Sequence, residues 1–162
     1  MDAAFFDSDD FYWQPTDPPY RAARDVAERQ QLIVNAISTN DRWVVAGSMC
    51  GWGDVIIPQI ELAIFVTTPT NLRIQRLRQR ERARFGDRII PGGDMHEAHE
   101  AFIRWATEYD TGTPDMRSRP MHEAWIAALP RAVMRVDGSR SIEALVDNLR
   151  ERVVSRDSRF DQ

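Results

Sequence analysis

Lysine is absent from this chain of 162 residues, and all 21 of its basic residues are arginines. The absence excludes any mechanism that needs a lysine ammonium as a phosphate clamp or as a Schiff-base nucleophile. Cysteine occurs once, at Cys50, so no disulfide can form within the chain. No apolar run approaches the length needed to cross a membrane, and the acidic first ten residues lack the pattern of a secretory or transit peptide. We therefore expect a cytoplasmic protein that does not use a membrane as a partner.

What is present is the composition of a soluble globular domain, with 43% hydrophobic and 28% charged residues, and the length predicts one domain over residues 1–162. The net charge of −4 gives no general case for nucleic-acid binding, but the charge is unevenly distributed. Residues 1–20 hold five aspartates and no arginine, whereas residues 73–88 hold seven arginines. This separation suggests a bound polyanion with a metal ion nearby; the alternative is two solvated surfaces.

Short apolar runs alternate with amphipathic segments, which predicts an α/β fold: an open, mostly parallel sheet with helices on both faces. The predicted strands are residues 3–6, 43–46, 62–66 and 132–136. The predicted helices begin at Asp17-Pro18-Pro19, at about Asn71, at Asp94, at Pro120 and at Ser139 or Ser141. Residues 155–162 are polar and are expected to fray.

In such a sheet the functional surface lies where the strands end. The segments that follow the predicted strands are residues 7–10, 47–54, 67–70 and 137–141. The second of these holds three of the eight glycines together with Ser48, Trp52 and Asp54. A glycine turn that only joins two core elements is the alternative interpretation of this segment. The three histidines, His96, His99 and His122, show no metal-ligand spacing with the cysteine.

These four strand ends, in this order, resemble the adenylate kinase and shikimate kinase branch of the P-loop NTPases. Residues 5–13 (Phe-Phe-Asp-Ser-Asp-Asp-Phe-Tyr-Trp) are similar to the second strand and aspartate motif of that branch, and residues 43–48 to its third strand. Residues 136–139 are similar to the turn that lies against the adenine. The arginines of the family's lid are resembled by Arg73, Arg76, Arg80 and Arg84. The resemblance spans residues 4 to about 153.

The resemblance implies phosphoryl transfer from ATP to a small-molecule or nucleotide acceptor, with Mg²⁺. Asp7 and Asp9 would be catalytic, and Asp9 would hold Mg²⁺ through water. Arg76 and Arg80 would close over the transferring phosphoryl group. The implied substrate-binding residues are Asp10, Ser48, Trp52, Asp54, Arg73 and Arg84, and those beside the nucleotide base are Gly138 and Ser139.

The residues themselves leave two alternatives open. The aspartates after the first strand are also typical turn formers and helix caps. The arginine-rich helix can be a solvated face with Glu81 as an ion-pair partner. Arg117 and Arg119 are further candidates to join the phosphate-binding arginines.

One part of the family pattern has no counterpart. The family begins with a strand, a Gly-x-x-x-x-Gly-Lys-[Ser/Thr] loop and a helix, and no such loop occurs here. In the family that strand is central, lying between the strands similar to residues 43–47 and 62–66, so its absence would leave two strand edges facing a gap.

Three explanations compete for the missing segment. The first is that the chain is truncated at its N-terminus. The second is that the two half-sheets close on each other in a non-catalytic fold. The third is that the strand is supplied by another partner or by a second copy of the chain, which would form a homo-oligomer. In each case we expect impaired use of ATP by the chain as it stands. The alternative function is a non-catalytic binding or assembly module. A nucleic-acid role is disfavoured because residues 73–88 hold a single aromatic residue rather than a series interleaved with the arginines, and because the net charge is acidic.

Overall fold

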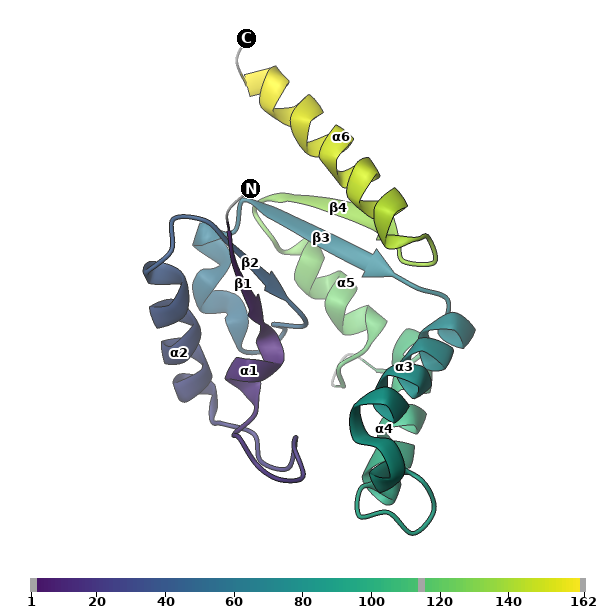
Figure 1. The fold of residues 1–162 in the computed structure, drawn as a ribbon. Coiled ribbons are helices and arrows are strands. Elements are labelled where there is room, and N and C mark those ends of the chain that lie inside the picture. Colours follow the sequence, from purple (N-terminus) through teal and green to yellow (C-terminus); the bar gives the residue numbers. More distant parts are fainter. Residues whose placement is uncertain (1–2, 114–115, 161–162) are drawn as a thin grey trace. The chain divides into compact units, whose positions relative to one another are not determined.

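The computed structural model describes residues 3–113 and 116–160, and strands and helices alternate along the chain (Figure 1). The chain divides into two compact units: unit 1 consists of Met1–Glu61 and Thr111–Pro130, and unit 2 of Leu62–Asp110 and Arg131–Gln162. Each unit holds one pair of parallel strands. The predicted mixture of helices and parallel strands is therefore confirmed. A single open sheet with helices on both faces and a single domain stay predictions.

Unit 1 is built on strands β1 (Ala4–Asp7) and β2 (Trp43–Ala46), which pair in parallel with Phe5 beside Val44 and Asp7 beside Ala46. Its helices are α1 (Ser8–Tyr12), α2 (Val26–Ser38), the 3₁₀ helix η1 (Gly53–Gln59) and α5 (Arg119–Ala127). The buried core consists of Phe11, Ile33, Ile37, Met49, Trp52, Ile56 and Ile60. This core joins α1, α2 and η1 to the loop that follows β2.

The prediction that a helix begins at Asp17-Pro18-Pro19 is wrong. Helix α2 begins at Val26, and its first turn is capped by Asp25, whose side chain accepts a hydrogen bond from the Glu28 amide at 2.8 Å. The proline segment instead belongs to a loop that returns to α1, where the Arg24 amide donates to the Tyr12 carbonyl. The effective cap is the aspartate whose carboxylate reaches a free first-turn amide.

Unit 2 is built on strands β3 (Leu62–Thr67) and β4 (Ala132–Asp137), which pair in parallel with Thr67 beside Asp137. Its helices are α3 (Thr70–Phe85), η2 (Gly86–Ile89), α4 (His96–Thr107), η3 (Glu108–Asp110) and α6 (Ile142–Phe160). Ser141 is the cap of α6, since its hydroxyl accepts from the Ala144 amide at 3.2 Å. Of the tail predicted to fray, residues 161 and 162 lie outside the described residues.

The prediction that Asp94 caps the next helix is wrong. Helix α4 begins at His96, and no side chain caps it. Both carboxylate oxygens of Asp94 instead accept hydrogen bonds from Arg88, at 3.0 and 2.7 Å. A two-pronged guanidinium contact is stronger than one amide hydrogen bond, which accounts for the difference.

No helix among the described residues is both long and apolar enough to span a membrane.

Both sheets leave apolar side chains uncovered. In unit 1 the register partners Phe5 and Val44 are 67% and 53% exposed. In unit 2 Ile64 and Val66 of β3 are exposed, whereas their partners on β4 are buried. In unit 2 the uncovered surface therefore lies on the β3 side of its sheet.

Candidate functional site

The acidic segment after β1 forms the first part of the site. Asp7 is the N-cap of α1, and its side chain accepts a hydrogen bond from the Asp9 amide at 3.0 Å. Asp10 is exposed and Asp9 is half-buried. The capping role that was an alternative for these aspartates is therefore confirmed for Asp7, while their catalytic and substrate-binding roles stay predictions. Among residues 3–113 and 116–160, no three His, Cys, Asp or Glu side chains are grouped to hold a metal ion.

The glycine segment after β2 lies directly against this acidic segment. Because β1 and β2 are parallel and in register, Asp7 and Ala46 lie side by side at the same edge. Gly47 has a φ of 112°, and a Cβ there would lie 1.9 Å from the Ser8 Oγ. Ser8 is buried at the start of α1. The absence of a side chain at Gly47 thus allows the two strand-end segments to pack together.

Hydrogen bonds from two helices hold the glycine segment in place. The Ser48 Oγ lies 2.8 Å from the His122 Nε2 on α5. The indole of Trp125, also on α5, donates to the Asp54 carboxylate at 2.7 Å. Trp52 is only 2% exposed, so it belongs to the core, and its carbonyl accepts from Gln30 on α2 at 3.0 Å. Ser48 and Asp54 are thereby fixed relative to α5.

The pKa values of His122 and Cys50 are both shifted in the direction that favours the neutral side chain. Burial lowers the pKa of His122 below its ordinary value, and the nearby positive charge of Arg117 lowers it further. Burial also raises the pKa of the Cys50 thiol, against the opposing effects of a hydrogen bond from Ser48 and of Arg117. The cluster therefore combines a hydroxyl, an imidazole and a thiol, the latter two with their neutral forms favoured, near the permanent charge of Arg117.

Arginine side chains organise the surroundings of α1. The guanidinium of Arg24 donates to the carbonyls of Asp10, Phe11 and Trp13 at the end of the helix. The Tyr12 ring, on the same helix, carries the Arg29 guanidinium 3.7 Å from its centroid and the Arg117 guanidinium 5.3 Å from it. The end of α1 is thus tied to α2 and to the segment before α5.

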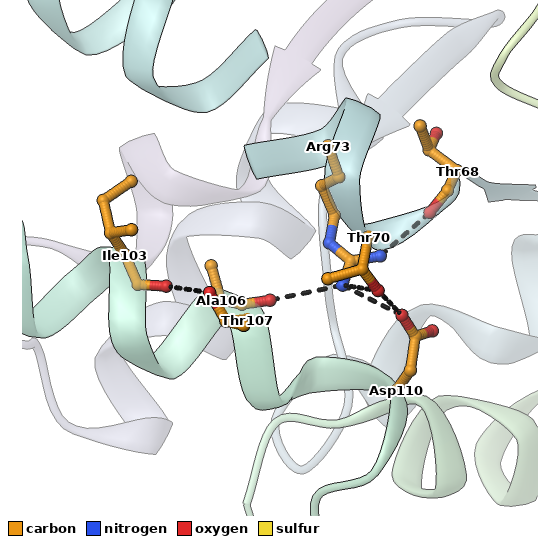
Figure 2. A network of polar contacts seen from close by, with 7 residues as sticks. All are labelled: Thr68, Thr70, Arg73, Ile103, Ala106, Thr107 and Asp110. Atoms are coloured by element: carbon orange, nitrogen blue, oxygen red, sulfur yellow. Dashed lines mark hydrogen bonds and ion pairs between the residues drawn. The ribbon is translucent and has the colours of Figure 1, made fainter. Parts of the chain in front are cut away.

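In unit 2 Arg73, the first of the four arginines predicted to belong to a lid, is held by internal partners (Figure 2). Arg73 donates to the Thr68 carbonyl at 2.9 Å and to the Ala106 carbonyl at 3.2 Å, and it pairs with Asp110 at 3.0 Å. Thr70 also bonds Asp110. These contacts join the start of α3 to the end of α4. They give Arg73 a structural role, and its substrate-binding role stays a prediction.

The other lid arginines differ in their partners. Arg76 donates to the Gly138 carbonyl at 2.5 Å, which links α3 to the turn after β4. Arg80 pairs with the buried Glu81, as the alternative interpretation expects, while its own side chain is 61% exposed. The Arg84 guanidinium lies 5.2 Å from the centroid of the Phe85 ring. Arg73 and Arg76 thus contact the strand-end segments of unit 2.

The turn after β4 is packed against the end of β3. The Gly138 amide donates to the Thr67 carbonyl at 2.7 Å, and a Cβ at Gly138 would lie 2.3 Å from the Thr68 Oγ1. The Ser139 amide donates to the Asp137 side chain at 2.9 Å, which lowers the pKa of that carboxyl. Contact of this turn with a nucleotide base stays a prediction.

The predicted site residues therefore fall into two sets, one in each unit. Asp7, Asp9, Asp10, Ser48, Trp52 and Asp54 belong to unit 1, and Arg73, Arg76, Arg80, Arg84, Gly138 and Ser139 to unit 2. The contact of His122 with Ser48 was missed, since the two residues are 74 positions apart and no spacing rule connects them.

Comparison with known proteins places the chain in a family. No protein-family model matches the chain, and no solved structure matches it. The protein of Bacillus subtilis (strain 168) with the name "Uncharacterized protein YqaC" is 33% identical to it over 143 residues, which cover 88% of this chain and 79% of that protein. A similarity of this level over most of both chains indicates common descent. The chain belongs to the family of YqaC.

Proposed function

We propose that this chain supplies the acceptor-binding segments and the lid arginines of a P-loop-type kinase that phosphorylates a small molecule or a nucleotide. The observation that carries the proposal is the pairing of the strands. Among the described residues, β1 pairs with β2 and β3 with β4, both in parallel, and the four strands form two separate pairs. The resemblance to the adenylate kinase and shikimate kinase branch implies a missing central strand between strands that correspond to β2 and β3.

The uncovered apolar residues support the same proposal. Val44 of β2 is 53% exposed, as is Val66 of β3, and Ile64 is also exposed. These two strands are the ones that would flank a central strand. Exposed apolar side chains on a strand favour a covering element, since burying them releases free energy. A strand followed by a helix would cover them.

The chemistry assigned to the chain's own residues is positioning and charge stabilisation. Asp9, half-buried beside the capping carboxylate of Asp7, fits a water-mediated contact with Mg²⁺, which would neutralise charge on the phosphoryl group. Arg76, held on the Gly138 carbonyl, would bring a guanidinium to the transferring group. The residues present do not fit an ATP triphosphate, because the chain has no lysine and no Gly-x-x-x-x-Gly-Lys-[Ser/Thr] loop. The proposal therefore requires a donor loop that these residues do not supply.

The proposed setting follows from the same reasoning. We place the protein in the cytoplasm, with a small-molecule or nucleotide acceptor as its partner and with neither membrane nor nucleic acid. Where the missing strand is not part of the same polypeptide, a second copy of the chain would supply it in a homo-oligomer.

A binding or assembly module without turnover is the second candidate. It is favoured by the internal partners of Arg73, which occupy a guanidinium that a kinase lid would offer to phosphate. On this alternative the strand-end segments bind an acceptor-like ligand without phosphorylating it.

Binding of a fluorescent ATP analogue with Mg²⁺ separates the two candidates. The gene is read upstream of the Met1 codon for an in-frame Gly-x-x-x-x-Gly-Lys, and the longer product is compared with the 162-residue chain. We expect the longer product to bind the analogue and Arg76→Ala to weaken binding at least tenfold. Arg78→Ala, on the same helix but paired with Glu100 at the surface, is the matched control. If neither product binds the analogue, the kinase proposal is wrong and the binding module is favoured.

A further inference from the structure

Arg117 is a half-buried arginine in the segment that leads into α5. It forms no ion pair or hydrogen bond with any residue in the ranges 3–113 and 116–160, although it is half-buried. Its guanidinium is instead placed by the Tyr12 ring, 5.3 Å from the ring centroid. Contact with an aromatic face leaves the in-plane N–H donors of a guanidinium available. The side chain is therefore positioned and charged, and it donates no hydrogen bond to the part of the chain that the structure describes.

The neighbours of Arg117 are polar but carry little charge. The Ser48 hydroxyl and the His122 imidazole form a hydrogen-bonded pair at 2.8 Å. Arg117 lies in the segment that leads into α5, the helix that carries His122, and its positive charge acts to lower the pKa of both His122 and Cys50. Of the nearby carboxylates, Asp54 accepts from the Trp125 indole, and Glu123 pairs with Arg119. The positive charge of Arg117 is thus left without a counter-ion among the described residues.

We propose that Arg117, together with the hydrogen-bonded pair Ser48 and His122, binds an oxyanion, namely the carboxylate or phosphate group of the molecule that accepts the phosphoryl group. The guanidinium fork matches the oxygens of either anion, and a serine hydroxyl is a common third contact. The inference rests on the proposed function only for the name of the ligand. It narrows the acceptor to molecules that carry a negative charge.

The site predicts a spectroscopic consequence at His122. A bound anion stabilises the protonated imidazole, so binding raises the pKa of His122 from its lowered value. Removing the Arg117 charge also raises that pKa, since one of the two causes of its depression disappears. The two effects differ in their dependence on anion concentration, and this difference is the basis of the test.

The experiment follows the His122 ring signal by NMR during pH titrations of the 162-residue chain, with inorganic phosphate or acetate added at constant ionic strength set by NaCl. His122→Gln assigns the signal. We expect one or both probes to raise the pKa of His122 saturably, with phosphate or acetate identifying the preferred group. Arg117→Gln should raise the pKa without added anion and weaken the anion effect at least tenfold.

Two variants guard against a trivial explanation. Arg119→Gln removes a charge two positions away that already pairs with Glu123, and it should leave the anion effect unchanged. Arg117→Lys retains the charge without the fork, and it should retain part of the effect even if Arg117→Gln is poorly folded. The proposal is overturned if neither probe acts beyond NaCl, or if Arg119→Gln weakens the effect as much as Arg117→Gln. No ATP enters the test, so a failed kinase assay and a failed oxyanion site give separate results.

Discussion

Replacing Gly47 by alanine would place a methyl group in the space that Ser8 occupies. The added Cβ would lie 1.9 Å from the Ser8 Oγ and 2.9 Å from the Ser8 Cβ, both far inside van der Waals contact. Ser8 is 3% exposed and has little room to move. The φ of 112° at Gly47 adds a second cost, because residues with a Cβ rarely adopt it.

The magnitude follows from these two terms. Backbone strain at such a φ costs about 1–3 kcal/mol, and overpacking at a buried contact adds about 1–3 kcal/mol. Gly47→Ala is therefore expected to lower the free energy of unfolding by about 2–6 kcal/mol. Gly51→Ala is the matched control in the same loop: its φ is 80°, but its added Cβ would meet Met121 at an ordinary 3.7 Å. It should incur the strain term alone, about 1–3 kcal/mol.

Urea denaturation followed by circular dichroism measures both losses. A double-mutant cycle with Ser8→Gly isolates the contact, because that substitution removes both Ser8 atoms closest to the added Cβ. We expect the double variant to recover about 1–3 kcal/mol relative to the sum of the single changes. The reasoning is refuted if Gly47→Ala costs no more than Gly51→Ala and shows no coupling to Ser8→Gly.

Three further predictions concern single side chains. Asp110→Asn is expected to lower the free energy of unfolding by about 1–2 kcal/mol, because it weakens the ion pair with Arg73. Asp87→Asn, at the exposed pair with Arg82, should lower it by only about 0–1 kcal/mol. Equal losses in urea denaturation would contradict this prediction. Cys50 should react with iodoacetamide more slowly in the native chain than in urea at about pH 7, because burial raises its pKa; equal rates would contradict it. Because the pKa of His122 is lowered on folding, the unfolded chain binds the proton first, and stability should fall as the pH drops below about 6.5 until the folded pKa is reached. His122→Asn should remove that part of the slope in denaturation curves, and an unchanged slope would contradict the assignment.

Strand and helix boundaries could be predicted where residues close together in the sequence determine them. The apolar run Trp43–Ala46 predicts β2 with its observed bounds, since Gly47 ends it by adopting a φ that other residues avoid. The start of α2 was placed wrongly because two aspartates precede the helix, and the prolines favoured the first. The decisive signal was Asp25 with Glu28 three residues later, a pattern whose carboxylate reaches the first-turn amide.

In the candidate site, the sequence predicts the contacts that follow from adjacent residues or from parallel strand pairing. It does not predict the contacts that depend on how helices pack. Parallel pairing brings the ends of β1 and β2 to one edge, so the proximity of the acidic and glycine segments follows from the fold class. The pairing of Arg80 with Glu81 follows from adjacency. The contacts of Arg73 with Asp110 and of Ser48 with His122 depend on how α3 meets α4 and how α5 meets the loop after β2. No residue spacing or hydrophobic periodicity in the sequence indicates either of these contacts.

Because all basic residues of the chain are arginines, the density of positive charge along the sequence does not indicate where an anionic ligand would bind. A guanidinium offers five N–H donors in a plane, so it can hold several carbonyls at a helix end, as Arg24 does for α1. Arg73 is used in the same way at the junction of α3 and α4. The dense arginines of residues 73–88 are therefore partly structural, and their number overstates the positive charge offered to a polyanion. The cation that we propose for anion binding is instead Arg117, which lies outside this arginine-rich segment and contacts the Tyr12 ring.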